Sequence, residues 1–434
     1  DANTPAATTS ATIPGGTAKV GTVITVTIVA GESGLTCSSC TMNGVALAAF
    51  ALSSGTTYTA TYTVVEGNTD RAAGATTVSV TLTDAAGNSN SAHTALVESS
   101  AQTIDANTPA ATTSATGTAD TLGVGDTITL TIVASEASLT CSACTMNSGT
   151  LTSFTNSDGS TYTAVYTVVE GQTDRAAGAS NFISLVLSDA AGNTNAAFVT
   201  LTESGGAITI DANTPAITSA TVSGGTAKVG TAITLTVVAD AAGYTLSSGT
   251  LNAVAVTGFS DDGGGTYTMT YTVVEGNSDR AAGATPVSIV LNDGENTNSA
   301  HTTLVESAAQ TIDANTPAAT TSATIPGGTA KVGTVITVTI VAGESGLTCS
   351  SCTMNGVALA AFALSSGTTY TATYTVVEGN TDRAAGATTV SVTLTDAAGN
   401  SNSAHTALVE SSAQTIDANT PAATTSATIP GGTA

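Results

Sequence analysis

Side chains that carry oxygen atoms recur at fixed places along this chain of 434 residues. Glu66 and Asp70 stand in the string VVEGNTD, and Asp105 and Asn107 open the string DANTPA. DANTPA recurs unchanged along the chain, and VVEGNTD recurs with small changes. Ca²⁺ takes six to eight oxygen ligands in irregular geometry, and carboxylates and amides supply them. The candidate chemistry is therefore cation binding, provided that the fold brings these residues together.

Cysteines form a second recurring motif, TCSSC or TCSAC. A four-cysteine zinc site needs two CxxC pairs in one fold, and haem attachment needs a His after the second Cys, where this chain has Thr. We expect a local disulfide in each pair, across the loop between the strands expected at Thr22–Ala30 and Leu35–Met42, in an oxidising compartment. Free or interchain-bonded thiols are the alternative. The pairs are Cys37 with Cys40, Cys141 with Cys144, and Cys349 with Cys352.

The elements that position these residues are predicted to be β-strands. In Thr22–Ala30 (TVITVTIVA), Ile and Val alternate with Thr, and Thr57–Val65 and Thr76–Thr83 alternate in the same way. A period of two with Thr on the wet face is typical of half-buried strands. Gly and Asn mark the turns between them. The other expected strands are Thr8–Ile13, Leu35–Met42, Val45–Leu52 and Ala92–Ile104, which makes seven in a two-sheet Greek-key sandwich.

The chain is a tandem array, because DANTPA recurs at regular intervals. Residues 1–104 and 313–416 are identical, while the two repeats between them diverge but keep TVVEG and DRAAGA. Length is the property that many copies of one module provide, so a structural role is favoured. The predicted domains are 1–104, 105–210, 211–312 and 313–416, followed by the start of a fifth at 417–434.

Loops of a seven-stranded sandwich alternate between its two ends, so we expect the recurring acids to meet at the junctions between repeats. A junction Ca²⁺ would then stiffen the array. Turn formation and pairing of Asp70 with the adjacent Arg71 are the alternative roles for these acids. The expected ligands are Glu66, Asp70, Asp105, Asn107, Glu136 and Asp189 at the first junction, Glu170, Asp174, Asp211, Asn213, Asp240 and Asp293 at the second, and Glu275, Asp279, Asp313, Asn315, Glu344 and Asp396 at the third.

Three strings carry a family resemblance: DANTPA at the start of a repeat, GTTYTATYTVVEG in its middle and VTLTDAAGNSN near its end. Together they resemble bacterial immunoglobulin-like (Big) repeats, which build tandem arrays in large bacterial surface proteins and adhesins. The resemblance implies an all-β array of Ig-like sandwiches at the cell surface. The third repeat departs from it, with NDGENTN where the others have DAAGN, and the family does not require the CxxC pair.

Composition and motifs exclude several functions. The net charge of −24 argues against nucleic-acid binding, which needs a basic surface. No apolar run reaches the roughly 18 residues of a membrane span. No triad or phosphate loop has its motif context, and a rod of small sandwiches offers no cleft for paired catalytic acids. We therefore expect neither an enzyme nor a small-molecule substrate.

Two structural functions follow. The first is the shaft of an extracellular fibre or surface filament, with copies of the chain as partners. The second is the spacer of a giant adhesin whose ligand-binding domain lies elsewhere. The two differ in lateral association: a fibre needs chains that touch side by side, and the low charged fraction of 9% favours it slightly.

Overall fold

The computed structural model describes residues 3–110, 112–179 and 182–431. It divides into two compact units, Asp1–Thr214 and Pro215–Ala434, which are described separately. Each unit contains two of the predicted repeats, whose individual boundaries stay predictions. The predicted start at Asp1 and the last residues of the stub, 432–434, lie outside the described residues.

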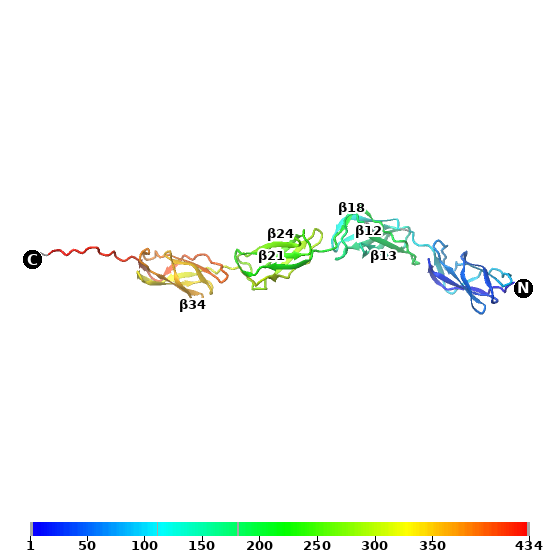
Figure 1. Ribbon diagram of the computed structural model, residues 1–434, viewed down its shortest axis with the longest axis horizontal. Helices are drawn as coiled ribbons and strands as arrows, with labels where there is room; N and C mark the ends of the chain where they lie inside the picture. Colours follow the sequence, from blue (N-terminus) through cyan, green and yellow to red (C-terminus); the bar gives the residue numbers. More distant parts are fainter. Residues whose placement is uncertain (1–2, 111, 180–181, 432–434) are drawn as a thin grey trace. The chain divides into compact units, whose positions relative to one another are not determined.

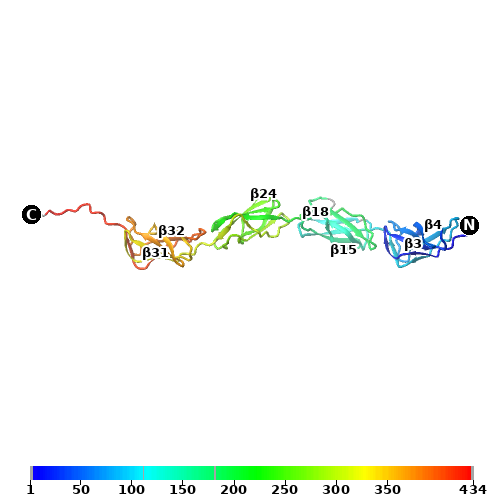
Figure 2. The same ribbon diagram turned by 60° about the horizontal axis from the view of Figure 1, so that its bottom comes forward.

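All regular elements of the described residues are strands (Figures 1 and 2). The first repeat contains β1 (Ser10–Ile13), β2 (Gly16–Lys19), β3 (Val23–Val29), β4 (Thr36–Met42), β5 (Val45–Ala46), β6 (Ala48–Ser54), β7 (Thr57–Thr63), β8 (Val78–Thr83), β9 (Leu96–Glu98) and β10 (Gln102–Asp105). The second contains β11 (Ser114–Leu122), β12 (Thr127–Val133), β13 (Thr140–Met146), β14 (Gly149–Thr150), β15 (Thr152–Asp158), β16 (Thr161–Thr167), β17 (Ile183–Ser188) and β18 (Thr202–Ile210).

The second unit repeats this pattern. Its first half contains β19 (Ile217–Val222), β20 (Gly225–Lys228), β21 (Ala232–Ala239), β22 (Thr245–Leu251), β23 (Val254–Ala255), β24 (Thr257–Gly263), β25 (Thr266–Thr272), β26 (Val287–Asn292), β27 (Val305–Glu306) and β28 (Gln310–Asp313). Its second half contains β29 (Ser322–Ile325), β30 (Gly328–Lys331), β31 (Val335–Val341), β32 (Thr348–Met354), β33 (Val357–Ala358), β34 (Ala360–Ser366), β35 (Thr369–Thr375), β36 (Val390–Thr395), β37 (Leu408–Glu410) and β38 (Gln414–Asp417).

The alternation in the sequence determines which face of each strand is buried. In β3, Ile24, Val26 and Ile28 are at most 2% exposed, while Thr25 faces solvent. Buried Tyr58 and Tyr62 of the neighbouring β7 complete this wall, and the Tyr58 hydroxyl accepts a hydrogen bond from the Leu35 N–H at 3.0 Å. The predicted all-β sandwich is confirmed, with a separate core in each repeat.

Each sandwich consists of a larger and a smaller sheet. In the first repeat the larger sheet has the order β6-β7-β3-β1-β9 and the smaller has the order β5-β4-β8. Strand β1 runs antiparallel to β3 and parallel to β9, which brings the start and the end of the repeat together. The additional pair β2 and β10 is also parallel.

The structure has more short strands per repeat than the roughly seven predicted. In the first repeat the predicted Val45–Leu52 and Ala92–Ile104 are each divided into two strands, and β2 follows the predicted Thr8–Ile13 as a separate strand. The first strand breaks at Pro14, which has no N–H to donate to a sheet. At Gly15 a Cβ would lie 1.7 Å from the Ser100 Oγ, so only glycine fits there. The chain can therefore leave the sheet of β1 and join that of β2.

The second repeat has no such break. Its corresponding segment lacks the Gly-Gly pair that the other repeats have at this place, and β11 runs unbroken over Ser114–Leu122 beside an equally unbroken β18. The two strands pair in parallel with one register shift between Thr118 and Asp120. One pair of long strands thus replaces the two short pairs of the first repeat.

Candidate functional site: the junctions between repeats

The first junction joins the turn after β2 to the loop after β17, both within the first unit. Lys19 Nζ donates to the carbonyl oxygen of Gly192 at 2.7 Å. The Val20 N–H donates to Asn193 Oδ1 at 2.9 Å. As the alternation of loops predicted, the bottom turn of one sandwich thus meets the top loop of the next.

Asn193 connects three segments of this junction. Its Nδ2 donates to the Asp105 carbonyl oxygen at 3.3 Å and to Asp189 Oδ2 at 3.0 Å. Its side chain therefore binds the turn of the first repeat, the linker and its own loop at once. Asn193 is 3% exposed, so its polar atoms depend on these protein partners.

The second unit contains the same arrangement. Lys228 Nζ donates to the Gly399 carbonyl oxygen at 2.8 Å, and the Val229 N–H donates to Asn400 Oδ1 at 2.8 Å. Asn400 Nδ2 donates to the Asp313 carbonyl oxygen at 3.2 Å. The recurrence follows from sequence, since both units have Lys-Val-Gly in the turn and Asp-Ala-Ala-Gly-Asn in the loop.

The predicted acids of the loop after β7 hold the linker. Asp70 Oδ1 accepts hydrogen bonds from the Ala106 N–H and from Asn107 Nδ2, both at 2.8 Å. Glu66 accepts one from the Thr108 N–H at 3.0 Å. The corresponding contacts recur for Asp174 and Glu170, for Asp279 and Glu275, and for Asp382 and Glu378.

Asp105 lies where these negative charges meet. Burial raises the pKa of its carboxyl group, and the charges of Asp189, Asp70 and Glu66 raise it further, against the lowering effect of the Asn107 N–H. Burial likewise raises the pKa of Glu136, with contributions from Asp189 and Asp105. Four of the other residues predicted for this junction, Glu66, Asp70, Glu136 and Asp189, therefore interact electrostatically with Asp105.

Asp313 repeats this behaviour in the second unit. Burial raises its pKa first, followed by the charges of Asp396, Asp279 and Glu275. The side chain of Asn315 donates to Asp279 Oδ1 at 2.8 Å, as Asn107 does to Asp70. The Glu344 carbonyl oxygen accepts a hydrogen bond from the Tyr370 hydroxyl at 3.5 Å.

The residues predicted for the middle junction are divided between the two units and serve turns within each. In the first unit, Asp211 Oδ1 accepts from the Asn213 N–H at 3.3 Å. In the second unit, Asp240 Oδ1 accepts from the Ala216 N–H at 2.9 Å and the Tyr244 hydroxyl at 3.1 Å. Burial, followed by this bond to Asp240, raises the pKa of Tyr244 to about 12. Asp293 Oδ1 accepts the N–H of Asn296 at 2.6 Å.

A cation cluster is not preformed at these positions. Among the residues that the structure describes, no three His, Cys, Asp or Glu side chains gather as metal ligands do. The first junction does contain a hollow of about 390 Å³, lined by Asp70, Arg71, Asp105, Ala190 and Ala191 among others. Calcium binding at the junctions therefore stays a prediction.

The CxxC motifs lie in strands, not in the loop where we had placed them. Cys37 and Cys40 belong to β4 and pair with Leu82 and Val80 of β8, with a register shift between Cys37 and Ser39. The two sulfurs are bonded to each other. Cys141 and Cys144 on β13, and Cys349 and Cys352 on β32, are bonded in the same way.

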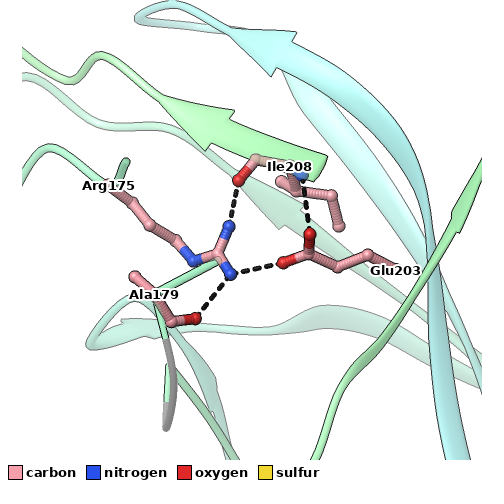
Figure 3. A network of polar contacts seen from close by, with 4 residues as sticks. All are labelled: Arg175, Ala179, Glu203 and Ile208. Atoms are coloured by element: carbon pink, nitrogen blue, oxygen red, sulfur yellow. Dashed lines mark hydrogen bonds and ion pairs between the residues drawn. The ribbon is translucent and has the colours of Figure 1, made fainter. Parts of the chain in front are cut away.

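Among the described residues, the recurring Arg forms no ion pair with the Asp beside it, which was one of the alternative roles for that Asp. Arg175 in the second repeat is 5% exposed and forms an ion pair with Glu203 of β18 (Figure 3). Its guanidinium also donates to the carbonyl oxygens of Ile208 and Ala179 and lies 3.5 Å from the ring centroid of Phe182. In the first repeat the equivalent Arg71 Nε has no hydrogen-bond partner among the described residues.

The sequence analysis missed Lys19 and Asn193, which make the direct contacts across the junction. The signal for Asn193 was present, because the string DAAGN recurs with its Asn next to the expected end of a strand. Lys19 carries no such signal, because the second repeat has Gly123 at that position. A residue that is absent from one repeat can still make contacts at the junctions formed by other repeats.

Fold and junctions together define a tandem array of Ig-like sandwiches that are linked by direct contacts between neighbouring repeats within each unit. Residues 105–205 match the model of the family described as "Bacterial Ig-like domain". The second repeat belongs to this family, which confirms the predicted resemblance. The other repeats share its TVVEG and DRAAGA motifs.

Solved structures with several sandwich domains align with the chain at low identity. The ICAM-5 D1–D4 ectodomain fragment is 13% identical over 90% of this chain and 96% of that one, with a TM-score of 0.27. The N-terminal four Ig domains of Dscam1 isoform 7.44 are 13% identical over 93% and 97%, with a TM-score of 0.18. Clostridium thermocellum CbhA fibronectin(III)-like modules are 14% identical over 46% and 94%, with a TM-score of 0.21. No curated protein matches the chain.

Within the described ranges, the structure has no helix that is long and apolar enough to cross a membrane.

Proposed function

We propose that this chain forms part of the shaft of an extracellular fibre or surface filament, in which the repeats supply length and the junctions fix how one repeat follows the next. The observation that carries the proposal is the buried side chain of Asn193, which binds the preceding repeat, the linker and its own loop. A chain of independent modules would not need such a residue. The role is structural, and we propose no reaction.

Calcium at the junctions is the second part of the proposal. Ionised Asp105 is disfavoured by its burial and by the charges of Asp189, Asp70 and Glu66. A divalent cation in the neighbouring hollow would offset this repulsion, since Ca²⁺ accepts carboxylate, carbonyl and water oxygens. The hydrogen bonds that these acids already make support the competing role, turn formation.

Thermal unfolding in millimolar CaCl₂ and in EGTA tests the calcium proposal. We expect the melting temperature to rise clearly with Ca²⁺ and to fall with EGTA, because a ligand that binds only the folded state stabilises it. Magnesium at the same concentration is the control, since it demands octahedral geometry and dehydrates reluctantly. An unchanged melting temperature in all three solutions would leave turn formation as the role of the acids.

The proposed partners are further copies of the chain. Strand β6 ends the larger sheet of the first repeat, and its Leu52 is 52% exposed. Val97 on β9, at the other end of that sheet, is 54% exposed. Free sheet edges with apolar residues can accept a strand of another chain.

The spacer of a surface adhesin is the alternative, and the charge of the chain favours it. Acidic residues outnumber basic ones by 31 to 7, so neighbouring chains repel each other. The two functions separate in analytical ultracentrifugation. A fibre subunit should associate with increasing concentration and with salt, whereas a spacer should sediment as a monomer throughout.

A further inference from the structure

The two sulfurs of each CxxC disulfide differ in their access to solvent. Cys40 is 5% exposed and packs in the core of the first repeat, whereas Cys37 is only half-buried. The register shift between Cys37 and Ser39 puts both cysteines on the face of β4 that lies opposite buried Leu82 and Val80, so the two sulfurs can meet, and Cys37 lies nearer the end of the strand. The second and fourth repeats show the same order, with Cys144 and Cys352 buried and Cys141 and Cys349 half-buried.

A hollow of about 380 Å³ lies beside the outer sulfur of the first repeat. Cys37, Leu35, Phe50, Leu52 and Tyr58 are among its lining residues. Two of these lining residues pack on each other: Phe50 stacks on Tyr58 with ring centroids 4.9 Å apart. A small molecule with an apolar part can therefore reach Cys37 without unfolding of the repeat.

The inner sulfur faces a hydrogen-bond acceptor. Cys40 Sγ lies 3.9 Å from the Thr81 carbonyl oxygen, and the equivalent distances from Cys144 and Cys352 are both 3.8 Å. A disulfide sulfur has no hydrogen to donate, so this contact becomes a hydrogen bond only when the inner cysteine is a thiol. The fold thus provides a partner for the inner cysteine in its reduced form.

We propose that Cys37, Cys141 and Cys349 are sites of thiol–disulfide exchange at which an external thiolate forms a mixed disulfide. The thiolate attacks the outer Sγ, a new S–S bond forms there, and the original S–S bond breaks. The electron pair leaves on the inner sulfur, which takes a proton from water and leaves hydroxide. The resulting thiol then donates a hydrogen bond to the facing carbonyl oxygen. One disulfide replaces another, so no further oxidant or reductant is needed.

The third repeat shows that the fold does not depend on the sulfurs. It has Leu246 in place of the outer cysteine and Gly249 in place of the inner one, yet the same register shift occurs between Leu246 and Ser248. A Cβ on Gly249 would lie 2.8 Å from Val256 Cγ2, because apolar side chains occupy the space of the disulfide. Opening the bond in another repeat therefore does not require the strand to rearrange.

The test uses the full chain with only the first pair retained, Cys141, Cys144, Cys349 and Cys352 being replaced by Ser. In this background Cys40→Ser leaves the outer thiol and Cys37→Ser leaves the inner one. Glutathione disulfide is the probe, and mass spectrometry follows the adduct. We expect Cys37 to react at least about tenfold faster than Cys40, and the two rates to become similar in guanidinium.

Two additions keep the result interpretable. Cys40→Gly copies the third repeat and serves if Cys40→Ser destabilises the fold. The intact pair, treated with reduced glutathione and quenched with iodoacetamide, should carry glutathione on Cys37 and the alkyl group on Cys40. Equal native rates, or a faster reaction at Cys40, would overturn the proposal.

A further experiment distinguishes two sources of the thiolate, a second copy of the chain and a small thiol. The Cys40→Ser chain is oxidised in air without glutathione and run on a non-reducing gel. A disulfide-linked dimer would support a second copy of the chain as the source, and an adduct formed only with glutathione would support a small thiol. Failure of both arms would contradict the exchange itself, whatever the outcome for the proposed shaft.

Discussion

At the scale of residues, a single buried asparagine bonds three segments where the first two repeats meet. Asn193 satisfies the Val20 N–H of the preceding repeat and uses its own N–H groups on the linker and on Asp189. The equivalent Asn88 of the first repeat makes the same bonds to Asp84 within its loop. Comparing Asn88 with Asn193 therefore distinguishes the role of this asparagine within its loop from its role in bonding the preceding repeat.

Replacing Asn193 with Ala should loosen the first junction. The change leaves the Val20 N–H without its acceptor, and an unsatisfied buried group costs about 1–3 kcal/mol. Hydrogen exchange of the segment 17–23, read by mass spectrometry, should become faster. Asn88→Ala is the matched control and should leave that segment unchanged; equal effects of both variants would contradict the assigned role.

Replacing Asp105 with Asn should stabilise the chain in EGTA at neutral pH. Because its pKa is raised, the folded chain holds this proton to a higher pH than the unfolded chain does. The cost of ionisation is absent below the unfolded pKa and is complete above the folded pKa, so stability falls as pH rises through that window. The gain is on the order of a few tenths of a kcal/mol after solvent screening.

Thermal melts at neutral pH and at pH 3 check this prediction, since the variant should gain only at neutral pH. Asp84→Asn is a control of opposite sign. The Asn88 side chain donates to Asp84 and lowers its pKa, so the loss of that charge should destabilise the chain at neutral pH. The Asp105 account fails if both variants shift the melting temperature in the same direction.

At the scale of elements, the strands themselves were predictable and their interruptions were not. Alternation of Thr or Ser with apolar residues or Tyr located β3, β7 and β8, because burial of one face dictates that pattern. The break between β1 and β2 was read as an ordinary turn boundary, although Pro14 and two glycines there move the chain between sheets. The sequence correctly predicted which loops lie at the end of a sandwich that faces its neighbour. Which atoms bond across a junction depends on side-chain geometry, which one sequence does not specify.

The merged strands of the second repeat depend on a buried ion pair. Glu203 of β18 pairs with Arg175, whereas the equivalent Glu98 accepts hydrogen bonds from the N–H groups of Gly74 and Gln102. Glu203→Gln leaves a buried guanidinium without its counter-charge, which costs about 3–5 kcal/mol. Hydrogen exchange in β18 should accelerate strongly, and Glu98→Gln should have a much smaller effect on β9 and β10. Similar effects would show that the ion pair has no special role.

At the scale of the whole molecule, we propose that repeated sandwiches with bonded junctions form a structural shaft. Both units contain the same junction: Lys19 donates to Gly192 and Val20 to Asn193 in the first, and Lys228 donates to Gly399 and Val229 to Asn400 in the second. Replacing both lysines with Met should weaken the junctions while the cores, in which neither lysine takes part, stay folded. Circular dichroism should remain unchanged, and limited proteolysis should cut the linkers faster; unchanged proteolysis would assign the lysines no role there.

Electron microscopy of the full chain in millimolar Ca²⁺ and again in EGTA tests whether the repeats form a calcium-dependent shaft. We expect ordered filaments of several chains in Ca²⁺ that are lost or disordered in EGTA. Single, unassociated chains of the same appearance in both solutions would contradict the shaft and the junction calcium together.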